Sequence, residues 1–295
     1  FVFYAIFASF STYFCMYAFR KPFTAAGYAD LQFFGTAIEL KTALVISQLV
    51  GYTLSKFIGI KTCSEAVGGR RGRFLVILIV LAHASLFLFA VLPVQWKFVG
   101  IFLNGVPLGM IWGLVVSYLE GRKSSDLLLA GLACSFIVAS GVVKDVGRWF
   151  IRDIGLTEFW MPFATGALFL IPFFMAVWLL EQLPKPTAED KAIRCERTAM
   201  NGQERWAFIR AFTGGLILLL VFYLLLTAYR DYRDNYQLEL FKALGYGDEK
   251  PTVFSFSETV VAFGVMVVMA VLNLVRSNAR GFFASYLVMG LGLAL

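Results

Sequence analysis

The chain has 295 residues, of which 59% are hydrophobic and only 15% are charged, and its formal net charge is +7. Ordinary globular domains carry about 25% charged residues. A soluble core of this size could not bury so much apolar surface, so the composition excludes a soluble enzyme or binding domain. It predicts an all-α integral membrane protein.

Apolar runs long enough for a membrane-spanning helix recur along the chain. A helix needs about 20 such residues to cross a bilayer. The runs are continuous rather than alternating, which argues against a β-barrel. The predicted spans lie near residues 1–27, 42–60, 74–93, 97–118, 127–150, 160–180, 212–230, 252–275 and 281–295.

A charged segment divides these spans into two groups. It contains Pro184 and Pro186, mixes both charge signs and lacks a spanning core. We therefore predict a six-helix bundle at 1–183, a cytoplasmic linker at 184–211 and the start of a second bundle at 212–295. Because the first and last residues both lie in apolar runs, we expect this second bundle to be truncated.

The charge of the loops predicts the orientation in the membrane. The connections at 61–73, 120–123 and 182–211 are basic and alternate with loops of mixed or acidic charge. Cytoplasmic loops carry an excess of Lys and Arg. The pattern predicts a cytoplasmic N-terminus in a bacterial inner (cell) membrane. The net charge of +7 then reflects loops that face anionic lipid, and nucleic-acid binding is not expected.

The first and seventh spans carry matching polar stripes. When residue n is set beside residue n+210, Arg20 aligns with Arg230 and Tyr13 with Tyr223. Each stripe follows the spacing i, i+4, i+7, i+11, so its members share one helical face. The pairing indicates two related halves, as in many transporters. The stripes are Tyr13, Tyr17, Arg20 and Thr24, and Tyr223, Thr227, Arg230 and Asp234.

These features resemble the major facilitator superfamily. Its loop signature, G-x-x-x-D-R-x-G-R-R, has a degraded counterpart here, in which Gly51 is followed by "LSKFIGIK" at 54–61. Lys56 stands in place of the Asp, and Gly59 is kept. "YLEGRK" at 118–123 resembles the cluster after the fourth span. "YAFRKPF" at 17–23 is similar to the first span of organophosphate:phosphate antiporters and sugar-phosphate exchangers.

The resemblance implies a helical bundle of twelve spans that works by alternating access. In the phosphate-exchanging branch, one Arg in the first span and one in the seventh clamp phosphate, and Arg20 and Arg230 match those positions. The Asp of the loop signature takes part in gating contacts at the inner face. Gly51, Lys56 and Gly59 are thus a candidate gating motif, and the Lys at the Asp position predicts an uncharacterised branch.

The residues themselves also favour a site for an anion. An Arg at membrane depth is costly and usually faces a cavity, and its planar fork suits phosphate or carboxylate. The alternatives are that Arg20 and Lys21 snorkel at the outer interface, that Arg230 belongs to an extracellular extension, and that Lys144 marks the membrane boundary. The predicted substrate-binding residues are Arg20, Arg230, Lys144, Tyr13, Tyr17 and Tyr223.

Three further residues are candidates for proton coupling. Glu258 could accept a proton or pair with a cation, or it could stabilise a helix N-terminus near Ser255. Asp145 could pair with Lys144, for which Glu258 is the other expected partner. His83 could relay protons, or donate one hydrogen bond inside the bundle.

The sequence therefore predicts a secondary active transporter of an anionic, phosphorylated or carboxylated small metabolite. The alternative is a transporter-like membrane sensor or scaffold. No GxSxG or HExxH motif is present, so we expect neither an enzyme nor a cofactor or metal. The expected partners are the anionic substrate and the lipid bilayer.

Overall fold

The computed structural model describes residues 1–29, 31–65, 70–187, 190, 202–246, 253–275 and 277–294. This part of the chain is built from helices, and seven of them are long and apolar enough to cross a membrane. The prediction of an all-α integral membrane protein is confirmed. Of the nine predicted spans, those that match α2 and α11 are not among the seven.

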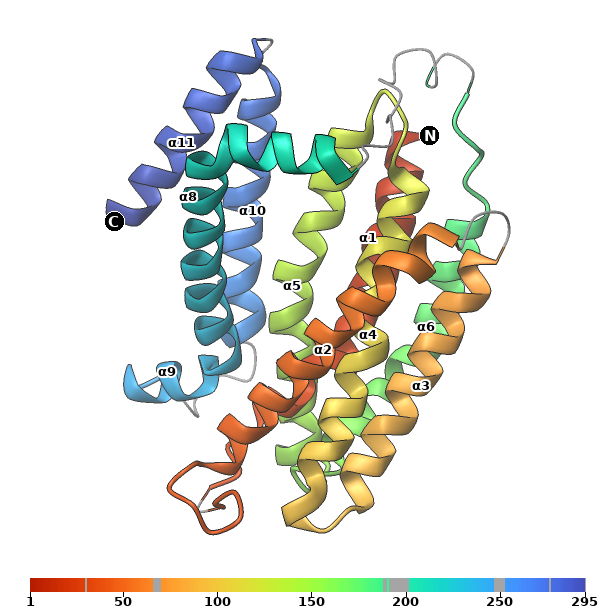
Figure 1. The fold of residues 1–295 in the computed structure, drawn as a ribbon. Helices are drawn as coiled ribbons and strands as arrows, with labels where there is room; N and C mark the ends of the chain where they lie inside the picture. The colour runs from red at the N-terminus through yellow and green to blue at the C-terminus, as the bar shows by residue number, and fades with distance from the viewer. Residues whose placement is uncertain are drawn as a thin grey trace.

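The first six long helices pack into one bundle (Figure 1). The core of the bundle includes α1, where Ala8, Met16 and Phe19 are fully buried. Many apolar side chains on the outer surface are exposed, among them Ile171 and Trp178, as expected where a helix faces lipid. The helices are α1 (Val2–Arg20), α2 (Leu40–Glu65), α3 (Arg71–Val91), α4 (Lys97–Leu119), α5 (Ser125–Arg152) and α6 (Met161–Glu181), with the short η1 (Pro22–Ala25) and η2 (Val94–Trp96).

The second group of helices lies beside α5. It comprises α8 (Gly202–Asn235), α9 (Gln237–Ala243), α10 (Val253–Asn273) and α11 (Asn278–Ala294). Figure 1 shows α8 crossing the upper end of the bundle and then turning to run alongside α10. Its sequence contains two consecutive glycines, Gly214 and Gly215, a pattern at which helices bend.

Helix α10 docks onto α5 through a small residue and a carboxylate. A Cβ atom added to Gly141 would lie 2.6 Å from the carbonyl oxygen of Phe254, so the two backbones are in close contact. Nearby, Asp145 accepts a hydrogen bond from the backbone N–H of Ser255 at 2.7 Å. Asp145 is therefore a packing and capping residue between the two groups of helices. It is not the partner of Lys144 that the sequence suggested.

Two predicted positions are wrong. The first span ends at Arg20 rather than residue 27, where Pro22 lacks the backbone N–H for a helical hydrogen bond and restricts the residue before it. The motif from Gly51 to Gly59 is not in a loop, since α2 continues to Glu65. The predicted linker is helical from Gly202 onward; residues 66–69, 188–189 and 191–201 lie outside the described part of the chain.

The described start of the linker is tied to the turn between α4 and α5. Asp190 accepts hydrogen bonds from the backbone N–H of Lys123 at 3.0 Å and from the backbone N–H of Thr187 at 2.9 Å. These bonds, led by that of Lys123, hold the pKa of the Asp190 carboxyl below its ordinary value. Arg122 donates to the carbonyl oxygen of Pro184. The linker thus leaves α6 on the side of the bundle where α4 ends.

Candidate functional site

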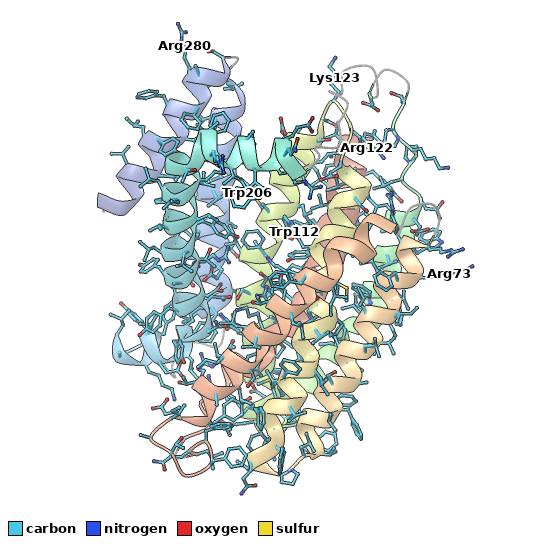
Figure 2. All side chains as sticks on the ribbon, viewed as in Figure 1. Arg73, Trp112, Arg122, Lys123, Trp206 and Arg280 are labelled. Carbon is cyan, nitrogen blue, oxygen red and sulfur yellow. The ribbon has the colours of Figure 1, made fainter. Side chains whose placement is uncertain are left out.

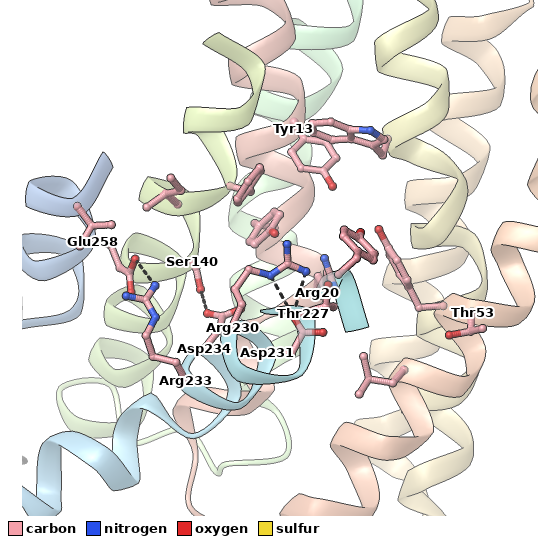
Figure 3. Close-up of a pocket in the computed structure, with 18 of the residues that line it drawn as sticks. Tyr13, Arg20, Thr53, Ser140, Thr227, Arg230, Asp231, Arg233, Asp234 and Glu258 are labelled. Carbon is pink, nitrogen blue, oxygen red and sulfur yellow. Dashed lines mark hydrogen bonds and ion pairs between the residues drawn. The ribbon is translucent and has the colours of Figure 1, made fainter. Parts of the chain in front are cut away.

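A cavity of about 540 Å³ lies between the six-helix bundle and α8 with α10. Figure 3 shows Tyr13 and Arg20 on one side of it, and Arg230, Arg233 and Glu258 on the other. The lining residues from the bundle are Tyr13, Tyr17, Arg20, Leu49, Tyr52, Thr53, Lys56, Trp112, Phe136, Ile137 and Ser140. Those from the second group are Tyr223, Thr227, Arg230, Asp231, Arg233, Asp234, Glu258 and Val261.

The end of α1 places Arg20 at this cavity. The last turn of a helix leaves carbonyl groups without intrahelical partners, and here two side chains from neighbouring helices satisfy them. Asn104 on α4 donates to the carbonyl oxygen of Phe19 at 3.0 Å, and Gln48 on α2 donates to that of Arg20 at 3.0 Å. Gln48 also donates to Asn104 at 3.0 Å. The backbone of Arg20 is therefore fixed by α2 and α4.

We expect Asn104→Leu to destabilise this corner strongly. Asn104 is fully buried and also donates to the carbonyl oxygen of Ala82 at 3.0 Å. The substitution removes the hydrogen-bond partner of the Phe19 carbonyl and of the Gln48 side-chain amide, at a cost of about 1–3 kcal/mol for each buried group. Thermal unfolding in detergent measures the effect. Ser85→Ala is the control, because Ser85 bonds only within α3 at an exposed position; an equal loss in both variants would contradict the prediction.

The guanidinium of Arg20 faces aromatic rings rather than a carboxylate. Its central carbon lies 4.4 Å from the ring centroid of Tyr52 and 5.6 Å from that of Tyr17. Its Nε atom is buried and has no hydrogen-bond partner among the described residues. Cation–π contacts of this kind stabilise a cation but leave its N–H donors available. Arg20 can therefore donate hydrogen bonds to a ligand anion.

The cations on the other side of the cavity are paired within their own group of helices. Arg230 lies 3.3 Å from the carboxylate of Asp231, its neighbour in the sequence. Arg233 donates to Glu258 at 3.1 Å, and the Glu258 side chain is 3% exposed. Glu258 is an ion-pair partner inside α10. It is not a cap at the helix N-terminus, and its second oxygen accepts from Gln237 at 3.0 Å.

Below these cations, buried lysines of the bundle bind the end of α8. Asp234 forms ion pairs with Lys21 at 2.5 Å and with Lys144 at 2.7 Å. Both lysine side chains are at most 3% exposed. The neutralised lysines therefore lie inside the protein, and the snorkelling alternative is wrong for Lys21. Lys144 pairs with Asp234, and with neither Asp145 nor Glu258 as the sequence suggested.

A third lysine extends this set of contacts to α9. Lys41, at the start of α2, lies 2.5 Å from the carboxylate of Glu239 and is itself 2% exposed. Thr42 and Tyr236 share a hydrogen bond at 2.9 Å. We call Lys21, Lys41 and Lys144 with Asp234 and Glu239 the lysine lock. Its carboxylates lie at the end of α8 and on α9, on the side of the molecule away from the N-terminus (Figure 1).

The structure brings together most of the residues that the sequence singled out. Tyr13, Tyr17, Arg20, Tyr223 and Arg230 all line the cavity, and Lys144 reaches it through Asp234. His83 does not line it, since its ring stacks on Phe163 at 4.4 Å between α3 and α6. Tyr52, Trp112 and Phe136 also line the wall and were not predicted from the sequence. Gln48, Tyr52 and Lys56 share one face of α2 at helical spacing, a signal that could have indicated the contribution of this helix.

The glycines of the candidate gating motif pack inside the bundle, and its lysine lines the cavity. Gly51 and Gly59 are buried within α2, whereas Lys56 is exposed at the cavity wall. Lys56 lies 5.1 Å from the ring centroid of Tyr52, one turn away on the same helix. Among the residues that the structure describes, no group of three or more His, Cys, Asp and Glu could hold a metal ion.

Comparison with known proteins gives one match. A family described as "Family of unknown function (DUF5690)" matches residues 22–295. No curated protein and no solved structure matches the chain. Since the match covers α2 to α11, which is far more than half of the chain, the chain belongs to the DUF5690 family.

Proposed function

We propose that this protein is a secondary active transporter of an anionic small metabolite, with two related halves of the major facilitator type. One observation carries the proposal. The polar stripes of the first and seventh spans are related in the sequence by a shift of 210 residues, and all their members except Thr24 line the same cavity, from opposite sides. Arg20 and Arg230 lie at corresponding positions of α1 and α8 on that cavity. Transporters built from two repeats bind their substrate at the interface between the repeats.

The charges support an anion as substrate. Arginine stays protonated in proteins, and its fork donates two parallel hydrogen bonds to a carboxylate or phosphate. The aromatic side chains Tyr13, Trp112 and Phe136 form a chain of ring contacts, at 4.9 Å and 6.3 Å between centroids. This wall suits the apolar or cyclic body of an organic anion, while the arginines take the anionic group.

Alternating access requires one end of the cavity to be closed while the other is open. In the proposed cycle, the lysine lock closes the end away from the N-terminus and the linker. The basic residues Arg122, Lys123 and Arg280 lie toward the other end (Figure 2). By the positive-inside rule this other end faces the cytoplasm. We therefore assign the structure to an inward-facing state in a cell membrane of the bacterial inner-membrane type.

Counterflow in proteoliposomes tests the proposal. Vesicles with purified protein are loaded with unlabelled glucose 6-phosphate or phosphate, and uptake of the labelled anion is followed. We expect uptake to exceed that of empty vesicles. Arg20→Gln and Arg230→Gln should weaken anion binding roughly 10- to 100-fold, as loss of a charge-assisted hydrogen bond predicts. Arg210→Gln is the control, because Arg210 is exposed on α8 outside this cavity.

The outcomes separate the two functions that the sequence left open. Uptake that is lost in both cavity variants and kept in the control supports transport. Anion binding without uptake, sensitive to the same variants, replaces the transporter by a sensor or scaffold. Binding and uptake that are equal in all variants would remove Arg20 and Arg230 from the site.

A further inference from the structure

The lining of the cavity separates charged side chains from aromatic ones. Figure 3 shows Tyr13 at one end of the lining residues, and Arg20, Arg230 and Asp231 together at some distance from it. Tyr13 precedes Arg20 by about two turns on α1, and Tyr223 stands in the same relation to its Arg on α8. Two turns measure about 10 Å along a helix. A ligand whose anionic group lies near the arginines therefore extends its body toward the tyrosines.

The wall beside Tyr13 is built from aromatic rings. The ring of Trp112 on α4 lies 4.9 Å from that of Tyr13 on α1 and 6.3 Å from that of Phe136 on α5, between centroids. The ring of Tyr17 lies 5.6 Å from that of Tyr13. Aromatic rings attract one another edge to face or offset-stacked, at centroid distances of about 4.5–7 Å. A ring of the ligand can join this chain through the same contacts.

The cavity offers few partners for the hydroxyl groups of a sugar. Among the lining residues that the structure describes, none is Asn, Gln or His. The lining carboxylates, which are Asp231, Asp234 and Glu258, are already in ion pairs. Ser140 donates its hydroxyl to Asp234. Because burial of a hydroxyl without a hydrogen-bond partner is unfavourable, a hydroxyl-rich body loses its water here without replacement.

We propose that the ligand of this cavity is an aromatic anion, with its ring packed among Tyr13, Trp112 and Phe136. Its anionic group lies toward Arg20 and Arg230. This proposal rests on the proposed function and narrows its substrate class to anions whose body is a planar ring with few or no hydroxyl groups. Sugar phosphates, which the sequence resemblance suggests, are then poor ligands. Trp112 stands between two other rings and is the residue that determines specificity for the body.

Two separate preferences follow from this wall. An aromatic ring is preferred over a saturated ring of the same size, because only the aromatic ring makes edge and face contacts with Trp112. A saturated ring is in turn preferred over a sugar ring, because it has no hydroxyl groups to desolvate. The cavity of about 540 Å³ has room for such a body, since pockets for small organic ligands measure roughly 300–1,000 Å³.

Competition in the counterflow assay tests both preferences. Phenyl phosphate, cyclohexyl phosphate and glucose 6-phosphate are each added outside proteoliposomes that contain the purified full-length protein. The concentration that halves the uptake of labelled phosphate is measured for each. Since all carry the same anionic group, the differences report only the body. We expect this concentration to be about 3- to 10-fold lower for phenyl phosphate than for cyclohexyl phosphate, and at least 10-fold lower than for glucose 6-phosphate.

Substitutions in the aromatic wall locate the ring. Trp112→Leu keeps an apolar side chain but removes the ring, so it should raise the value for phenyl phosphate about 3- to 10-fold and leave that for glucose 6-phosphate unchanged. Trp112→Phe should retain most of the preference. Phe136→Leu tests the same wall from α5 and should shift the value in the same direction. The matched control is Trp178→Leu, because Trp178 is 63% exposed on α6 outside the cavity; it should change nothing.

The outcomes separate this proposal from the proposed function. Counterflow that all three esters inhibit equally overturns the aromatic body and leaves the transporter standing. Stronger inhibition by glucose 6-phosphate, or equal inhibition by the phenyl and cyclohexyl esters, does the same. A preference that survives both Trp112→Leu and Phe136→Leu also overturns the proposal, and Phe136→Leu decides alone if Trp112→Leu takes up no phosphate. If the unchanged protein shows no counterflow, the proposed function fails and this proposal with it.

Discussion

Asp234→Asn is expected to destabilise the protein more than any other single change in the cavity. Asp234 neutralises two lysines, Lys21 and Lys144, whose side chains are at most 3% exposed. Removal of the carboxylate charge leaves two buried ammonium groups without an ion-pair partner. Breaking a buried pair by removing one member typically costs 3–5 kcal/mol. The expected result is a fall of many degrees in the melting temperature of the purified protein in detergent.

The matched control lies three residues earlier on the same helix. Asp231→Asn removes the partner of Arg230, whose side chain is 51% exposed. Exposed ion pairs contribute about 0–1 kcal/mol, so this variant should unfold close to the temperature of the unchanged protein. If the melting temperature falls as far in Asp231→Asn as in Asp234→Asn, the buried ion pairs of the lysine lock stabilise the protein no more than an exposed pair does.

The lysine lock also links stability to the proposed cycle. Its lysines lie on the six-helix bundle, whereas its carboxylates lie on α8 and α9, so it joins the two groups of helices directly. Opening that end of the cavity requires Asp234 to leave Lys21 and Lys144. Such a step has a low cost only if another anion replaces the carboxylate. In the proposed function, a substrate anion bound at Arg20, the sequence neighbour of Lys21, would take over that role, and exchange of one anion for another would follow.

Much of the candidate site was predictable because it follows helical periodicity. The stripe from Tyr13 to Arg20 and its counterpart from Tyr223 to Arg230 are visible as i, i+4, i+7 patterns, and such patterns need no tertiary information. The helices themselves were predictable because a continuous apolar run in a membrane must satisfy its backbone hydrogen bonds internally, and an α-helix does so. What the sequence could supply, therefore, was the local face on which each Arg lies.

The partners of the charges were not predictable in the same way. The sequence suggested Asp145 or Glu258 for Lys144, yet Asp234 takes that place because the end of α8 descends beside α5. Asn104 and Gln48 gave no signal, since their role depends on where α1 ends relative to α2 and α4. The degraded loop motif was misplaced because its similarity to a known signature outweighed the continuing helical pattern around Lys56.

Gly51→Ala is expected to have the second large effect, on both stability and anion binding. A Cβ atom at this position would lie 2.2 Å from the carbonyl oxygen of Phe102 on α4. That oxygen is part of the backbone and cannot turn away, so α2 must move outward. Overpacking of this kind costs about 1–3 kcal/mol. Because α2 carries Tyr52 and Lys56 of the cavity wall, the shift should also lower the counterflow of the labelled anion.

The control for this change is the same substitution where there is space. Gly264 lies within α10, and an added Cβ there meets nothing within 4 Å. Since Ala favours a helix interior over Gly by roughly 0.5–1 kcal/mol, Gly264→Ala should leave the melting temperature unchanged or raise it slightly. Thermal unfolding and anion counterflow are measured on both variants. If Gly51→Ala behaves like Gly264→Ala, the close contact of α2 with α4 does not hold Tyr52 and Lys56 at the cavity, and α2 has no part in the proposed anion site.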